Sequence, residues 1–80
     1  MNIKNLYEIE KKGVYQIVLI PEIELLCNLG LRAGTTVTIQ NRYTFGGPVL
    51  LRVEDTYIVA VGKDIAKEIQ AVNIREGGAL

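Results

Sequence analysis

The sequence predicts a mainly β protein, a small SH3-like five-stranded barrel with one short α-helix between the first two strands and a 3₁₀ turn before the last strand. Two observations lead to this prediction. Short segments rich in Val, Ile, Leu and Tyr alternate with turns marked by Gly, Pro and Asn. One further apolar segment has helical spacing and ends at a glycine.

The length and composition fit one domain. The chain has 80 residues, of which 49% are apolar, and we place a single domain at residues 1–76 and a loose tail at residues 77–80. The one cysteine, Cys27, excludes an internal disulfide framework. The 9 basic and 9 acidic residues cancel, which argues against a general binder of nucleic acid or anionic membranes. Since no segment resembles a membrane span or a secretion signal, we expect a cytoplasmic protein that is not embedded in a membrane.

Five segments have the composition of strands. The first covers residues 14–20, and its imperfect alternation indicates burial on both faces over part of its length. The segment at 36–40 alternates cleanly, as a half-exposed strand does, and residues 41–45 either continue it or begin a loop. The other three segments are 49–53, 57–61 and 68–74. The last of these could instead extend a helical turn at 62–67, and we favour a strand because it closes the barrel.

The apolar segment before Gly30 has helical spacing. Pro21 suits the first turn of this helix because its missing N–H costs nothing there, and Glu22 and Glu24 lie in the same turn, where the helix dipole favours negative charge. The residues that share its apolar face are Ile23, Leu26 and Cys27. Gly30 fits the left-handed position just past the helix, and Leu31 can then pack back on the helix as in a Schellman cap.

Three further turns connect the strands. Gly34 and Thr35 make a tight turn into the second strand, residues 46–48 form a loop by composition, and residues 54–56 form a hairpin turn. The glycines and the proline at these sites have a structural role. These motif residues are Gly30, Gly34, Gly46, Gly47 and Pro48.

Residues that catalysis or metal binding would need are scarce. The chain has no histidine, which removes the most frequent general base and metal ligand. Cys27 is interpreted as a small buried hydrophobe, with a catalytic or metal-bound thiolate as the alternative. Glu8 and Glu10, on a possible N-terminal strand, have no spacing that requires a metal ion. We predict no cofactor, because an Fe(II) or other divalent-metal site has no supporting ligand residues.

No motif predicts an enzyme. The segment Gly62-Lys63-Asp64 lacks the longer glycine loop and the Ser or Thr of a phosphate-binding loop. The Gly46-Gly47 pair lies between strands, whereas a dinucleotide site requires such glycines before a helix. No hydroxyl has a candidate general base. We therefore predict no catalytic residue and no enzymatic activity.

The loop at residues 42–47 carries two aromatic residues and a cation on an exposed connection. Arg and Tyr are favoured anchors of protein interfaces, so Arg42, Tyr43 and Phe45 are candidate contacts for a protein partner. Alternatively, Phe45 folds back and closes one end of the barrel. Binding of single-stranded nucleic acid is a third interpretation, which the balanced charge disfavours.

The glycine motifs, in this order, resemble the FeoA family, which comprises ferrous iron transport protein A and its related domains. The similarity runs from residue 14 to residue 72. It rests on Leu26-Cys27-Asn28-Leu29-Gly30-Leu31-Arg32-Ala33-Gly34-Thr35, Gly46-Gly47-Pro48-Val49, Ile58-Val59-Ala60-Val61 and Lys63-Asp64-Ile65-Ala66. Two positions depart from the family pattern, since Ala33 stands where proline is common and Phe45 where leucine is common.

The resemblance implies an SH3-like barrel and a small cytosolic accessory protein of bacterial ferrous iron uptake, which binds the cytoplasmic GTPase-bearing part of the permease FeoB. Such a regulator would dock on the permease and bias its conformation. Our candidate contacts are the helix face around Leu26 and the loop from Tyr43 to Phe45, with core packing as the alternative for Leu26. A further hypothesis is an arginine that acts on the GTPase, and the candidates are Arg32, Arg42 and Arg52.

Other functions stay open at this point. A carrier of iron or another divalent metal is one alternative, against which the missing histidines and the single cysteine argue. Similar SH3-like domains form the C-terminal part of iron-dependent repressors, but this chain carries no DNA-binding helix pair. A nucleic-acid-binding barrel would require a basic face and salt-dependent binding.

Overall fold

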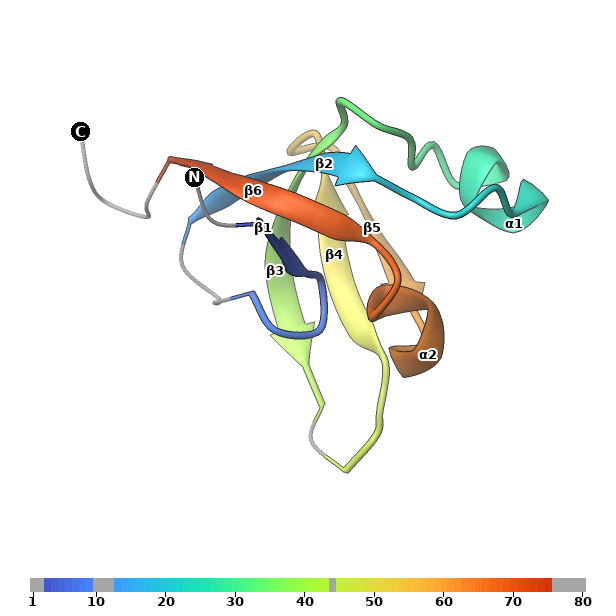
Figure 1. The fold of residues 1–80 in the computed structure, drawn as a ribbon. Coiled ribbons are helices and arrows are strands. Elements are labelled where there is room, and N and C mark those ends of the chain that lie inside the picture. The colour runs from blue at the N-terminus through green and yellow to red at the C-terminus, as the bar shows by residue number, and fades with distance from the viewer. Residues whose placement is uncertain (1–2, 10–12, 44, 76–80) are drawn as a thin grey trace.

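The residues described in the computed structural model, 3–9, 13–43 and 45–75, build one antiparallel sheet of six strands in the order β1-β6-β2-β3-β4-β5. In chain order the elements are β1 (Ile3–Asn5), β2 (Val14–Leu19), α1 (Glu24–Asn28), β3 (Thr36–Arg42), β4 (Val49–Val53), β5 (Tyr57–Val61), α2 (Lys63–Ala66) and β6 (Gln70–Arg75). The directions of β2 and β6 cross those of β3 and β4, so the sheet is strongly bent (Figure 1). The mainly β prediction, with a helix between the first two predicted strands, is confirmed.

The sheet has six strands and not the predicted five, because β1 adds to the edge of β6. Ile3 pairs with Val72 in this ladder. Three residues with one apolar side chain carry no periodic signal, so pairing with β6 decides their conformation and local propensity does not. The turn that follows β1 contributes Leu6 and Ile9 to the core, both 0% exposed.

Helix α1 starts later than predicted. Ile23 is extended, with φ −118° and ψ 126°, and the helix begins at Glu24. Pro21 and Glu22 therefore precede the helix, and only Glu24 lies in its first turn. A hydrogen bond from the Ile23 N–H to the Pro21 carbonyl, 2.9 Å long, turns the chain at this point instead.

Helix α2 is one turn of α-helix, and two hydrogen bonds of 3₁₀ spacing follow it before the last strand, from the Glu68 N–H to the Ile65 carbonyl at 2.9 Å and from the Ile69 N–H to the Ala66 carbonyl at 3.3 Å. The Ala66 N–H donates to the Gly62 carbonyl at 2.8 Å, and the Lys67 N–H donates to the Lys63 carbonyl at 3.0 Å. This spacing of four residues is that of the α-helix. The strand favoured after it is confirmed as β6, which pairs with β2 along its length.

The core lies inside the bend of the sheet. Strand β4 shows the pattern most clearly, since Val49, Leu51 and Val53 are buried and alternate with half-buried residues. The other buried apolar residues are Leu6, Ile9, Tyr15, Ile17, Leu26, Leu31, Val37, Ile39, Val59, Val61, Ala66, Ile69, Ala71 and Val72. A domain of this size buries only about 60% of the surface of its unfolded chain, so each of these contacts matters to its stability.

The end of α1 is the predicted Schellman motif. The Leu31 N–H donates to the Leu26 carbonyl at 2.9 Å, and the Gly30 N–H donates to the Cys27 carbonyl at 3.0 Å. Gly30 has φ +83°, the left-handed region that glycine adopts without strain. Leu26 and Leu31 are 2% and 1% exposed, so the stop holds both side chains in the core.

Tyr57 of β5 packs directly against this helix stop. Its hydroxyl donates a 2.7 Å hydrogen bond to the Leu29 carbonyl, which satisfies one of the free carbonyls at the helix end. The same hydroxyl occupies the space where a Cβ on residue 30 would project. Gly30 therefore suits this position through its backbone angle and also leaves room for the Tyr57 hydroxyl.

The turn at Gly34 is joined to β2 by hydrogen bonds. Gly34 has φ +99°, and its N–H donates to the Ile17 carbonyl at 2.7 Å, while the Ile17 N–H donates to the Thr35 carbonyl at 2.9 Å. The buried Thr35 hydroxyl accepts the Arg32 N–H at 3.2 Å and donates to the Gly30 carbonyl at 3.4 Å. The two glycine turns are thus bound to each other and to the sheet.

We predict that Gly30→Ala lowers the free energy of unfolding by about 1–3 kcal/mol, because alanine is strained at this φ and its Cβ collides with the Tyr57 hydroxyl. In a Tyr57→Phe background the same change should cost less, since the colliding oxygen is gone. Urea denaturation of the four proteins measures this coupling. Equal costs in both backgrounds would show that Tyr57 places no restriction on residue 30.

Candidate functional site

The predicted partner-binding residues differ in exposure. Leu26 is 2% exposed and belongs to the core, which was the alternative for this residue, so its side chain offers nothing to a partner. Arg42 is half-buried, whereas Tyr43 is 48% and Phe45 103% exposed. The exposed pair lies on the loop between β3 and β4, which projects from the lower end of the barrel in Figure 1.

Arg42 holds the N-terminal turn onto the sheet. Its Nη1 donates to the Tyr7 carbonyl at 3.1 Å and to the Ile9 carbonyl. These oxygens belong to a turn whose side chains enter the core, and they would otherwise lose their hydrogen bonds at a half-buried site. Arg42 therefore has a structural role that the sequence did not reveal, because its partners are main-chain atoms more than thirty residues away.

Phe45 has a left-handed backbone conformation and a fully exposed side chain. It has φ +62°, and Gly46 after it has φ +85°, so two successive residues are left-handed. Such a pair is typical of tight hairpin turns. For a bulky aromatic residue a positive φ is uncommon and strained. The alternative in which Phe45 folds back to close the barrel is wrong, since the whole side chain faces solvent.

Tyr43 and the glycines form the base of this loop. The Tyr43 N–H donates to the Pro48 carbonyl at 3.3 Å. A Cβ on Gly47 would lie 2.6 Å from the Tyr43 Cβ, so only glycine allows the tyrosine to cross at this point. The structural role predicted for Gly46, Gly47 and Pro48 agrees with these contacts.

A third segment, α2, lies at the same end of the barrel as the loop. A Cβ on Gly46 would be 4.0 Å from Cδ of Lys63. The Lys63 ammonium is 5.5 Å and the Lys67 ammonium 5.9 Å from the centre of the Tyr7 ring, within the range of cation–π attraction. Sequence reasoning missed these residues because no local spacing links residue 7 to α2.

Cys27 and the carboxylates do not assemble a reactive or metal-binding centre in the described part of the chain. Cys27 is exposed, which corrects the expectation of a buried hydrophobe. Glu8 lies in the turn after β1 and not on a strand, while Glu10 is outside the described residues. Within the described ranges no group of three or more Cys, Asp or Glu side chains could hold a metal ion.

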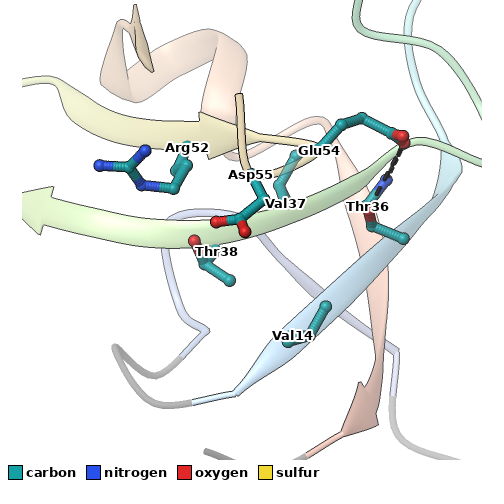
Figure 2. A pocket seen from close by; sticks show the side chains of 7 residues that line it. All are labelled: Val14, Thr36, Val37, Thr38, Arg52, Glu54 and Asp55. Atoms are coloured by element: carbon teal, nitrogen blue, oxygen red, sulfur yellow. Dashed lines mark hydrogen bonds between the residues drawn. The ribbon is translucent and has the colours of Figure 1, made fainter. Parts of the chain in front are cut away.

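A pocket of about 320 Å³ lies beside the β4–β5 turn (Figure 2). Its lining residues are Val14, Thr36, Val37, Thr38, Arg52, Glu54 and Asp55. The Glu54 carboxylate accepts the Thr36 N–H at 3.0 Å, and the Glu54 N–H donates to the Thr36 carbonyl at 2.9 Å. Figure 2 shows the Asp55 carboxylate turned toward Thr38 instead.

This pocket offers fewer oxygen ligands than a hard cation such as Ca²⁺ requires. The lining contains two carboxylates, and that of Glu54 already accepts a hydrogen bond from β3, which leaves that of Asp55. Ca²⁺ takes six to eight oxygen ligands. Arg52 Nε donates to Gln40 at 3.4 Å across the sheet. Arg32 is exposed on the turn before Gly34, so the three arginines considered for a GTPase lie on different parts of the surface.

Comparison with known proteins identifies the family. The sequence profile of the FeoA domain matches residues 4–73. The chain belongs to the FeoA domain family. The match includes β1 and the turn after it, which the glycine motifs alone did not cover. No curated protein matches this FeoA-domain chain. Within the described residues, no helix has the length and apolar character needed to cross a membrane.

Solved structures share this SH3-like fold. An iron uptake regulatory protein (FeoA) superimposes with a TM-score of 0.81 at 21% identity, over 92% of this chain and 100% of that one. A FeoA-like protein from Clostridium acetobutylicum has a TM-score of 0.77 at 25% identity, over 100% and 96% of the two chains. A manganese-dependent transcriptional repressor reaches 0.82 at 14% identity, over 92% of this chain and 38% of the repressor.

We predict opposite effects of substitution at two of the candidate residues. Leu26→Ala should lower the free energy of unfolding by about 2–5 kcal/mol, because it leaves a cavity in the core. Phe45→Asn should leave it unchanged or raise it by up to ~1 kcal/mol, because asparagine tolerates a positive φ and no burial is lost. Thermal or urea denaturation measures both. A large loss for Phe45→Asn would mean that Phe45 packs against the barrel.

We also predict that Arg42→Lys loosens the turn at residues 6–9. Lysine keeps the charge, but its side chain is shorter and lacks the fixed planar geometry in which Nη1 donates to both carbonyls, so stability should fall by about 1–3 kcal/mol. The rate of hydrogen exchange at the Leu6 amide should rise by the factor that corresponds to this loss of free energy. Arg32→Lys, at an exposed site, is the matched control. Unchanged exchange in the Arg42 variant would contradict this role.

Proposed function

We propose that this FeoA-domain chain is a non-enzymatic cytoplasmic accessory protein of ferrous iron uptake. It docks on the cytoplasmic GTPase-bearing part of the permease FeoB and biases the conformation of the permease. Family membership over residues 4–73 supports the link to ferrous iron transport. The observation that carries the docking proposal is the fully exposed Phe45, held in a left-handed conformation on the β3–β4 loop.

The loop has the physical properties of an anchor for a protein partner. Fully burying a phenylalanine side chain gains about 1.5–3 kcal/mol relative to leaving it in water. The left-handed pair at Phe45 and Gly46 and the close approach of Gly47 to Tyr43 give this part of the loop the geometry of a tight turn. An anchor that is ordered before binding loses less conformational entropy when the partner covers it.

Regulation by docking requires a difference in affinity. A bound protein shifts the conformational equilibrium of its partner only as far as its affinities for the two states differ. We therefore assign the effect on transport to preferential binding of one nucleotide state of the permease. This role requires no metal ion or cofactor held by the chain itself, and Arg32, Arg42 and Arg52 take no part in it as catalytic groups.

We predict saturable binding to the isolated cytoplasmic domain of the permease, with affinities that differ between GDP and a GTP analogue. Phe45→Ala or Tyr43→Ala should weaken this binding by about tenfold or more, as truncation of a central interface anchor does. Isothermal titration calorimetry measures both effects.

Leu19→Ala is the control, because Leu19 is 64% exposed but lies on β2, outside the β3–β4 loop. Circular dichroism verifies that each variant is folded. Absence of binding in both nucleotide states would overturn the proposed function. Binding that the Leu19 variant weakens as much as the Phe45 variant would move the contact away from the loop.

A further inference from the structure

Two lysines of the α2 segment share one side of their helix. Lys63 and Lys67 are four residues apart and both face the Tyr7 ring, at 5.5 and 5.9 Å. Asp64 and Glu68 follow the lysines by one position each, and both are exposed to solvent. The two cations of this segment therefore lie beside Tyr7, while its two carboxylates face solvent.

The lysine side is fixed by contacts that do not neutralise it. The Tyr7 N–H donates to the Asn5 side chain at 2.9 Å, and the Tyr7 carbonyl accepts Arg42, so the aromatic ring has a defined position. Neither lysine forms an ion pair with a carboxylate of the described residues. Arg42 donates to carbonyl oxygens, which carry no net charge, so within the described residues its positive charge is not paired with a carboxylate.

This cationic region adjoins the loop that carries Phe45. The aliphatic part of the Lys63 side chain lies beside Gly46, with Cδ 4.0 Å from the position of a Cβ there. In Figure 1 the turn after β1, the β3–β4 hairpin and α2 all lie toward the lower end of the barrel. We name this surface the basic-aromatic end, and its residues are Tyr7, Arg42, Tyr43, Phe45, Lys63 and Lys67.

The charge of this end is local. The complete chain has a net charge of zero, whereas the basic-aromatic end contains three cations. Glu8 is the one carboxylate of the described turn at residues 6–9, and it is exposed to solvent. An interface rim of one charge sign attracts a partner of the opposite sign and accelerates its association.

We propose that the basic-aromatic end binds an acidic protein surface, in which an apolar depression receives Phe45 and surrounding carboxylates face Lys63 and Lys67. This inference rests on the proposed function and adds the chemistry of the partner surface. A protein is favoured over single-stranded nucleic acid because the complete chain carries no net positive charge, whereas nucleic-acid binders have a basic excess.

The test measures affinity for the isolated cytoplasmic domain of FeoB at low and at high salt. The variant is Lys63→Glu/Lys67→Glu, and the control is Lys4→Glu/Arg32→Glu, which changes the net charge equally at exposed sites on β1 and on the turn before Gly34. Between about 0.01 M and 1 M salt the Debye length falls from ~30 Å to ~3 Å, which screens interactions between exposed charges.

At low salt the α2 variant should bind about tenfold more weakly than the unsubstituted protein, and the control should stay within about twofold of it. At high salt the affinities of the α2 variant and of the unsubstituted protein should converge.

Equal effects of variant and control on the affinity overturn the inference and leave the proposed function intact, provided that Phe45→Ala still weakens binding. No binding by the unsubstituted protein overturns both. Lysine-dependent binding to a single-stranded oligonucleotide, without binding to the permease domain, replaces the acidic protein by nucleic acid.

Discussion

The arrangement of the basic-aromatic end depends on the guanidinium of Arg42. By donating to the carbonyls of Tyr7 and Ile9, it joins the last residue of β3 to a turn near the start of the chain. That turn places the Tyr7 ring, and the ring in turn lies under the two lysines of the α2 segment. One side chain thus connects three segments that are distant in sequence, because a planar group with several donors can satisfy two carbonyls at once.

The opposite part of the molecule serves a different purpose. The Schellman stop of α1 and the hydroxyl of Tyr57 fix the helix against β5, and Leu26 and Leu31 fill the core below it. A domain this small buries little surface, so few contacts offset the conformational entropy that the chain loses on folding. The hydrogen bonds of the helix stop and of the glycine turns therefore matter to its stability. The strained, exposed Phe45 stands outside this pattern, which is why we assign it to function.

Local signals predicted the strands, the helix stop and the family, because each depends on residues close in sequence. Most of the fold, including the left-handed conformation of Gly30, could therefore be predicted from the sequence. Strand β1 was missed because its conformation depends on pairing with β6, and Cys27 was misplaced because a five-residue helix buries little more than Leu26. Less of the candidate site could be predicted from the sequence. Exposure of Phe45 depends on its backbone angle, and the role of Arg42 depends on carbonyls that no sequence pattern marks.

In the proposed complex one end of the barrel, and not the pocket or the α1 face, meets the partner. Backbone amide NMR shifts of this protein, recorded while the unlabelled cytoplasmic domain of FeoB is added, test this arrangement. The largest changes should fall in residues 6–9, 43–48 and 63–67, with Thr36 and Asp55 beside the pocket unaffected. Changes concentrated at the pocket or on α1, with the β3–β4 loop silent, would contradict it.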